Sequence, residues 1–375
     1  MAQTRNAYVL VDGEPEPIDP FAAKDYGLGE DFYVTVFREI EESTTLSGYT
    51  FFLAYHVPDA LPAYGPKVVF VVLADEAYQH RAWFSDVGCI LRCLGVRPVY
   101  LDGAPSSGLR AAALVHFLYK YAQHLTSVAR CVAATRRWTL GEVERKTLHV
   151  PLGVYGTFDP APKPAAERDV DYAFLGSLGF DDRFKKLIHR LMSPPKILAR
   201  RAMLRAVEAL PKTLRGRLRA TSDFWESVQT PEDYVRTMSR TKIALAPRGT
   251  SYETYRFFEA CKAGCLVVCE PLPKTWCYER HPGIELADWS DLPAVVAACL
   301  SDPAFLAAKS QETLDYWREV ACERAIAARV ARFVEATAPN GAQPESRNGR
   351  VQGGMVGSGF SAAMKAPARR ICHDV

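Results

Sequence analysis

Short, apolar runs recur through the first 150 residues and predict strands. They are NAYVLVD, FYVTVFREI, YTFFLAYHV, KVVFVVLADE, RPVYL and ARCVAA. The run KVVFVVL lacks polar alternation, which is typical of a strand buried on both faces in a parallel sheet covered by helices. Between Val72 and Val99 the chain has helical spacing that ends on Gly95, so we expect a βαβ unit there.

A proline-rich segment separates this part from a second set of elements. Four prolines lie between Pro151 and Pro164, and a new apolar strand, DYAFLGS, follows them. This break predicts a linker over 151–169 between two α/β domains, 1–150 and 170–336. Residues 337–375 are rich in Gly, Pro, Ser and Ala, which predicts a disordered tail.

The second set begins with a basic stretch at helical spacing, from Lys185 to Ala220. Further helices are expected over TPEDYVRTMSR, LPAVVAACL and FLAAKSQETLDYWREVACERAIAARVARFVEA. The alternation of strands and helices in both parts predicts an α/β fold of two Rossmann-like domains.

Composition and charge exclude some classes of protein. The net charge of +3 is too small to indicate a nucleic-acid binder, and no apolar run reaches the roughly 20 residues that span a bilayer. The first residues show no basic segment followed by an apolar core, so we expect no secretory signal and a cytoplasmic protein. The ten cysteines lie mostly in apolar runs without C-x-x-C spacing, which favours buried thiols over a metal site.

The run from Lys242 to Glu270, KIALAPRGTSYETYRFFEACKAGCLVVCE, predicts a strand, a turn, a helix and a second strand. Thr250 suits the helix N-cap, and Glu253 three residues later completes a capping box. Gly264 is expected to end the helix. A helix that begins at Ser251, beside a parallel strand's carboxyl end, offers free N–H groups to an anion, together with Arg248 and Gly249.

Arg256 and Glu259 are three residues apart and share one face of this helix. A surface ion pair is the simpler interpretation. A guanidinium also suits a diphosphate, and a carboxylate suits the hydroxyls of a ribose, so the pair is a candidate site for a nucleoside diphosphate.

The stretch PRGTSYETYRFFEACKAGCLVVC resembles the donor-site segment of exostosin-like and related glycosyltransferases with the two-Rossmann-domain (GT-B) fold. The resemblance implies that the two domains face each other across a cleft, with 1–150 on the acceptor side and 170–336 binding the donor. It implies that Arg256 contacts the diphosphate and that Glu259 holds the ribose. The complete donor-binding set is Arg248, Gly249, Thr250, Ser251, Tyr252, Arg256 and Glu259. Many retaining members carry a glutamate at the position of Ser251, so the stereochemistry stays open.

The expected reaction moves a sugar from a nucleotide-diphosphate sugar to a glycan, a lipid-linked acceptor or another small acceptor. The helix start and the arginines would stabilise the leaving diphosphate, so neither a metal ion nor another cofactor is needed. An inverting reaction needs a base, for which the candidates are Glu76, Asp75 and His80, all after the strand KVVFVVL. Asp75 also suits a helix cap, and His56 is a rival base.

The segment from Lys185 to Ala220 holds eleven Lys or Arg and one acidic residue, Glu208. It predicts either a solvated helical face or an amphipathic surface that contacts anionic lipid at a membrane. Nucleic acid is a weaker interpretation, because no aromatic residues are interleaved with the charges.

Three rival functions stay open. An epimerase or phosphorylase would use the same fold, a non-catalytic module would bind a nucleotide or glycan without turnover, and a purely structural protein would make the spacing of Arg256 and Glu259 a coincidence.

Overall fold

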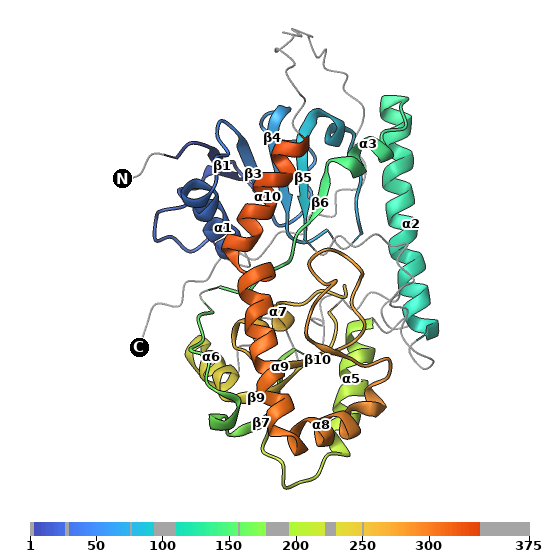
Figure 1. Cartoon of the computed structure of the whole chain (residues 1–375). Helices are drawn as coiled ribbons and strands as arrows, with labels where there is room; N and C mark the ends of the chain where they lie inside the picture. The colour runs from blue at the N-terminus through green and yellow to red at the C-terminus, as the bar shows by residue number, and fades with distance from the viewer. Residues whose placement is uncertain are drawn as a thin grey trace, which may run out of the picture. The chain divides into compact units, whose positions relative to one another are not determined.

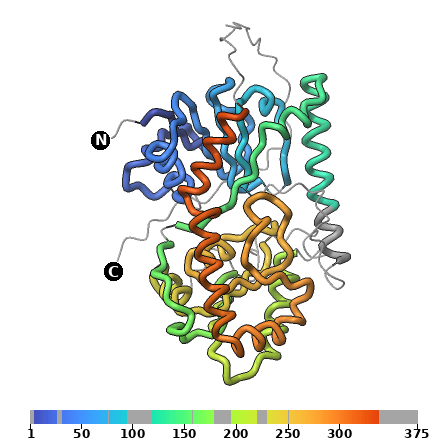
Figure 2. The backbone as a smooth tube through the Cα atoms, in the orientation of Figure 1, coloured from blue at the N-terminus to red at the C-terminus, as the bar shows by residue number. Residues whose placement is uncertain are grey.

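The computed structural model describes residues 4–26, 30–75, 77–93, 110–156, 158–177, 195–221, 230–249 and 251–337 (Figure 1). These residues form two sheets of mainly parallel strands with helices packed against them, so the predicted α/β fold with two Rossmann-like units is confirmed. One sheet uses strands before residue 150 and the other uses strands after residue 169, and Figure 2 follows the chain from one to the other. The exact domain boundaries stay a prediction.

The first sheet has the strand order β2-β1-β3-β4-β5-β6. Its strands are β1 (Ala7–Leu10), β2 (Glu16–Pro17), β3 (Thr50–Ala54), β4 (Gly65–Val72), β5 (Val87–Arg92) and β6 (Thr147–His149). Only the short edge strand β2 is antiparallel to its neighbour. The accompanying helices are α1 (Glu30–Ser43), η1 (Ala82–Asp86), α2 (Arg110–Thr135) and α3 (Leu140–Arg145).

The second sheet has the order β11-β10-β9-β7-β8, and all its strands are parallel. They are β7 (Val170–Ser177), β8 (Gly216–Thr221), β9 (Thr241–Ala246), β10 (Leu266–Cys269) and β11 (Ile284–Glu285). The helices of this part are η2 (Ala165–Glu167), α5 (Pro195–Glu208), α6 (Pro231–Ser239), α7 (Tyr255–Lys262), η4 (Trp289–Asp291), α8 (Leu292–Ser301), α9 (Pro303–Tyr316), the π-helix η5 (Trp317–Ala321) and α10 (Glu323–Thr337).

Two predicted strands of the first part are helical. The run FYVTVFREI belongs to α1, where Phe32, Val36 and Ile40 are buried at the four-residue spacing of a helix. The run ARCVAA belongs to α2, whose Val128 and Cys131 face inward. In FYVTVFREI, β-branched and aromatic residues favour a strand locally, but tertiary packing decides for a helix. ARCVAA is short and has one β-branched residue, Val132, so its strand signal is weak.

The helix expected between Val72 and Val99 is also wrong. Residues 82–86 form the short 3-10 helix η1, and Val87–Arg92 form β5, which pairs with β4. Cys89, Ile90 and Leu91 are all buried, so this strand is covered on both faces like β4. The run RPVYL lies outside the described residues.

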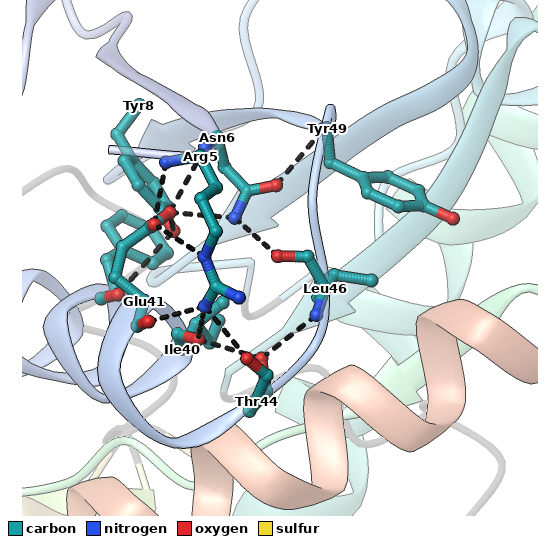
Figure 3. A network of polar contacts seen from close by, with 9 residues as sticks. Arg5, Asn6, Tyr8, Ile40, Glu41, Thr44, Leu46 and Tyr49 are labelled. Atoms are coloured by element: carbon teal, nitrogen blue, oxygen red, sulfur yellow. Dashed lines mark hydrogen bonds and ion pairs between the residues drawn. The ribbon is translucent and has the colours of Figure 1, made fainter. Parts of the chain in front are cut away.

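Polar contacts hold the N-terminal strand to α1 (Figure 3). Glu41 of α1 accepts hydrogen bonds from the backbone N–H of Arg5 at 2.7 Å and from the Tyr8 hydroxyl at 2.7 Å. Asn6 joins the same carboxylate to the Leu46 carbonyl through its side-chain amide. This network fixes β1 at its position beside β3.

The basic stretch is only partly helical among the described residues. α5 ends at Glu208, Pro211 follows, and Gly216–Thr221 form the edge strand β8 beside β7. The single amphipathic surface expected from Lys185 to Ala220 is therefore divided between a helix and a strand, and residues 185–194 lie outside the described part.

The final helical segment reaches back to the first sheet. It is divided by η5 into α9 and α10, and α10 packs against α1. Figures 1 and 2 show α10, in red, running beside α1. In the described part of the chain no single helix is long and apolar enough to cross a membrane; the bent pair Trp289–Ser301 and Pro303–Thr337 meets that test by length and composition alone. The predicted disorder of the tail lies beyond the described residues.

Candidate functional site at the carboxyl edge of the second sheet

The second sheet has a point at which its strand order reverses. From β7 the chain passes to β8 on one side, and β9, β10 and β11 then follow on the other side. In open α/β sheets, ligands bind outside the carboxyl ends of the strands at such a point. Ser177 ends β7 and Ala246 ends β9, so the segments after these residues lie at this edge.

The helix after β9 begins later than the sequence predicts. α7 begins at Tyr255, and the Thr254 side chain accepts a hydrogen bond from the Phe257 N–H as its N-cap. The predicted capping box of Thr250 and Glu253 and the predicted start at Ser251 are therefore wrong, and Thr250 itself is outside the described residues. Ser251 and Tyr252 belong to the loop that precedes the helix, as Gly249 does. Gly264 ends the helix with φ +67, as predicted.

Glu253 has a different structural role from the expected one. Its carboxylate accepts a hydrogen bond from the Leu152 N–H at 3.0 Å and one from the Tyr278 hydroxyl at 2.5 Å. The side chain is buried, so these contacts satisfy a charge that would otherwise be costly. Glu253 thereby ties the loop before α7 to the segment after β6.

Arg256 projects from the first turn of α7 toward β7. Its Nε donates to the Leu175 carbonyl, and its guanidinium carbon lies 5.3 Å from the centroid of the Phe174 ring. The guanidinium lies against Gly176, where a Cβ would come within 1.8 Å of Nη2. The strand's small residue therefore makes room for this arginine at the sheet's carboxyl edge.

Glu259 is buried, one turn further along α7. Its carboxylate accepts a hydrogen bond from the Tyr234 hydroxyl. Burial raises the pKa of Glu259, although Tyr234, Arg256 and the backbone N–H of Tyr155 act in the opposite direction. A surface ion pair between Arg256 and Glu259 is excluded, because Glu259 is not at the surface and Arg256 donates to Leu175 instead.

Arg248 follows β9 and is buried, with its guanidinium carbon 3.9 Å from the centroid of the Tyr252 ring. Its backbone N–H donates to Glu270 Oε2 at 2.7 Å. Glu270 comes directly after β10, so it lies at the same sheet edge. Burial raises the pKa of Glu270, and the charges of Arg248 and Arg200 oppose that rise.

Sequence reasoning missed Arg200 as well as Glu270. Arg200 projects from α5, is buried, and donates through Nη1 to the backbone carbonyl of Ser177 and, at 3.3 Å, to its hydroxyl. Burial lowers the pKa of Arg200 well below its usual value, and the nearby charge of Arg256 lowers it further. The sequence did not single out Arg200, because it belongs to a basic stretch that we interpreted as a surface. Glu270 could have been selected, because it directly follows a predicted parallel strand, and ligands bind at the carboxyl ends of such strands.

These contacts bring Arg200, Arg248 and Arg256 together around the ends of β7, β9 and β10. The charges of both Arg200 and Arg248 act on Glu270, so this carboxylate lies between the two arginines' elements at the sheet edge. The three buried or half-buried guanidinium groups outnumber the two buried carboxylates beside them, Glu270 and Glu259, and this excess of positive charge suits an anionic ligand.

The described residues contain no group of His, Cys, Asp or Glu that could hold a metal ion. The nine cysteines among them are unpaired, and eight are buried, in line with their expected place in the core. The chain has a D-x-D triplet, Asp169–Asp171, but its carboxylates pair with Arg240 and Lys242.

The base candidates of the first sheet are not equally placed. Asp75 is buried in an ion pair with Arg92 Nη1 at 2.5 Å and accepts from the Gln79 N–H at 2.8 Å, so its carboxylate is already engaged inside the protein. His80 is buried beside Thr139, and burial lowers its pKa to about 4. Glu76 lies outside the described residues.

His56 is exposed at the end of β3. Its Nδ1 lies 3.4 Å from the Ala74 carbonyl, and its backbone N–H donates to Asp12 Oδ1 at 3.3 Å. A donated Nδ1–H fixes the tautomer in which Nε2 is the basic nitrogen. Of the described candidates, only His56 has an exposed side chain.

No family model matches the chain, and no curated protein matches it. Among solved structures, the chain is similar to Anabaena HepE in complex with UDP-glucose, at 10% identity over 88% of this chain and 99% of that one, with a TM-score of 0.42. It is also similar to alpha-glucosyltransferase (AGT) in complex with UDP, at 10% identity over 89% and 100% of the two chains, with a TM-score of 0.39. A third match is the GtfA/B complex, at 10% identity over 82% of this chain and 60% of that one, with a TM-score of 0.35. The resemblance to exostosin-like enzymes in particular stays a prediction.

Proposed function

We propose that this protein is a glycosyltransferase that moves a sugar from a nucleotide-diphosphate sugar to an acceptor. The observation that carries the proposal is the convergence of Arg200, Arg248 and Arg256 at the point in the second sheet where the strand order reverses. Buried Glu259 lies one helical turn beyond Arg256 on α7. The two Rossmann-like units are the architecture expected of a GT-B enzyme. The acceptor, whether a glycan, a lipid-linked sugar or another small molecule, is a further part of the proposal.

The donor diphosphate lies against the three guanidinium groups. Each can offer paired N–H donors to phosphate oxygens, and their low exposure strengthens the attraction. Since Thr254 already caps α7, the arginines rather than the helix N-terminus contribute most of the stabilisation as charge develops on the leaving diphosphate. This arrangement supports a metal-independent transfer.

The donor ribose binds at Glu259. A carboxylate can accept about four hydrogen bonds, and Tyr234 and the Tyr155 N–H use only part of that capacity. Two neighbouring ribose hydroxyls provide the donors for the remainder. The loop residues Gly249, Ser251 and Tyr252, which the sequence also assigned to the donor, belong to the segment between Arg248 and the helix that carries Glu259.

If the reaction inverts the sugar, His56 takes the acceptor proton. Its Nε2 is the free nitrogen of an exposed ring at the carboxyl end of a parallel strand. Asp75 and His80 are weaker bases in this proposal, because each is buried and hydrogen-bonded.

The direct test is binding of nucleoside diphosphates by thermal stabilisation. A panel of UDP, GDP, ADP, CDP and dTDP is screened, and the binder should add about 2.7 kcal/mol at a concentration about 100 times its Kd. Arg256→Ala should remove the shift, whereas Arg332→Ala, an exposed arginine on α10, should leave it unchanged. A panel without any stabilising nucleotide would contradict the proposal. Stabilisation without hydrolysis or transfer of the matching nucleotide sugar would instead identify a non-catalytic binding module.

A further inference from the structure

The long helix α2 has two chemically different faces. Its inner face packs against the segment that follows β4: His124 Nδ1 lies 2.8 Å from the Tyr78 carbonyl, and Cys131 Sγ lies 3.2 Å from the His80 carbonyl. Val128, between these residues on the same face, is buried. These contacts fix the rotation of the helix, so the opposite face is turned away from that segment.

That opposite face is apolar and exposed. We name it the outer stripe, and it comprises Leu118, Ala122, Leu125, Ala129 and Ala133. The residues recur at spacings of four and three, so they form one continuous band along the helix. Leu118 is 52% exposed and Leu125 is 48% exposed, which is unusual for two leucines on one face of a helix.

The charges along the same segment have one sign. Residues 110–138 contain five Lys or Arg and no Asp or Glu. Arg130 and Arg137 are exposed near the C-terminal end of α2, and Trp138, which follows at once, is 72% exposed. An apolar band with flanking cations and an exposed tryptophan is the pattern of a helix that lies in a membrane interface.

We propose that α2 lies on an anionic lipid surface, with the outer stripe in the acyl boundary and the arginines at lipid phosphates. This surface differs from the segment 185–220 to which the sequence assigned lipid contact, and it does not depend on the glycosyltransferase proposal. A second copy of the chain fits the stripe less well, because two such helices would bring like charges together without an acidic residue to offset them.

The experiment is co-sedimentation of the full-length protein with vesicles. One set contains phosphatidylcholine alone, and the other contains phosphatidylcholine mixed with phosphatidylglycerol. We expect binding only to the anionic vesicles, with a decrease as salt is added. Leu118→Ser with Leu125→Ser should weaken binding at least tenfold. Arg130→Gln with Arg137→Gln should weaken it about 25-fold, from about fivefold for each charge.

Matched controls come from other surfaces of the chain. Leu218→Ser with Phe305→Ser removes two exposed apolar side chains, on β8 and α9, and Arg324→Gln with Arg332→Gln removes two exposed charges on α10. Both controls should bind like the unmodified protein. All these changes are at the surface, and circular dichroism should show the same helix content in each variant.

Tryptophan emission gives a second readout. The difference between the spectra of the unmodified protein and Trp138→Phe should shift to the blue when anionic vesicles are added. The proposal is overturned if anionic vesicles do not bind, if neutral vesicles bind equally well, or if the α2 variants bind as strongly as their controls. The proposal is also overturned if light scattering shows that the unmodified protein is a dimer and that the variant with Leu118→Ser and Leu125→Ser is a monomer.

Discussion

The guanidinium of Arg256 lies directly against the backbone of Gly176, at the end of β7. A Cβ on Gly176 would come within 1.8 Å of Nη2 and 2.2 Å of the guanidinium carbon. Gly176→Ala should therefore displace the arginine, which is the flexible partner, and leave the strand in place. If Arg256 binds the diphosphate, affinity for the nucleotide should fall about 10- to 100-fold, the range for a lost charged hydrogen bond or pair of bonds. Isothermal titration calorimetry measures the change.

The control for this variant is Gly141→Ala in α3, where the added Cβ has no atom closer than 3.9 Å. It should bind the nucleotide as the unmodified protein does and should gain about 0.5–1 kcal/mol from the better helix former. If Gly176→Ala binds the nucleotide with normal affinity, Arg256 does not contribute to donor binding.

Replacing Arg200 should weaken nucleotide binding without a comparable loss in the free energy of unfolding. It is a buried cation near a second cation, Arg256, and burial already lowers its pKa. Replacement by an apolar side chain of similar length removes the desolvation cost together with the repulsion. Arg200→Met should therefore change the unfolding free energy by no more than about 1 kcal/mol while nucleotide affinity falls at least tenfold. Urea denaturation and calorimetry give the two values; a large loss of stability with unchanged affinity would make Arg200 a structural residue only.

Glu270 should give stability a pH dependence of known sign. Because burial raises its folded-state pKa above the ordinary value of 4.5, the folded protein holds a proton that the unfolded chain releases above that pH. The stabilising contribution is thus complete below pH 4.5 and is lost as the pH rises through the higher, folded-state pKa. Glu270→Gln does not titrate, so its unfolding free energy relative to the unmodified protein should rise between acidic and neutral pH. Urea denaturation across that interval checks the sign, and a decrease would contradict it.

Thr254 should matter to the stability of α7 as its N-cap. Thr254→Ala removes the hydroxyl that accepts from the Phe257 N–H and should cost about 1 kcal/mol. Thr254→Ser keeps the hydroxyl and should restore most of that loss. If the alanine variant unfolded at the same urea concentration as the unmodified protein, the helix would begin elsewhere.

The sequence was sufficient to predict those elements of the second sheet whose local residue pattern agrees with the way they pack in the fold. The buried strands β7, β9 and β10 and the glycine stop at Gly264 were all expected from apolar runs and a single residue type. The start of α7 was predicted wrongly, because both Thr250 and Thr254 can cap a helix. The length of the loop after β9 decides between them, and the local sequence does not show that length. In α1, the apolar aromatic run satisfies strand propensity and helical spacing at once, and tertiary packing chooses the helix.

The residues of the candidate site likewise divide into those that the sequence could predict and those that only the fold brings together. Arg248, Arg256 and Glu259 could be selected because one motif places them in the turn and the helix that follow a strand. Arg200 and Glu270 join them only through the strand order, which brings α5 and the end of β10 to β7 and β9. Pairing partners such as Arg92 for Asp75 depend on the register of β4 and β5, which no local pattern contains.

Asp75 and His56 should respond to mutation in opposite ways. Asp75→Asn leaves Arg92 buried without its charged partner and should cost about 3–5 kcal/mol of stability. His56→Ala removes an exposed side chain and should change the unfolding free energy by less than about 0.5 kcal/mol. If His56 takes the acceptor proton, the same variant should lose about 10²- to 10⁴-fold in kcat while it binds the nucleotide normally. Turnover measured with a radiolabelled nucleotide sugar, alongside urea denaturation of both variants, makes the comparison. Full activity in His56→Ala would exclude this histidine as the base.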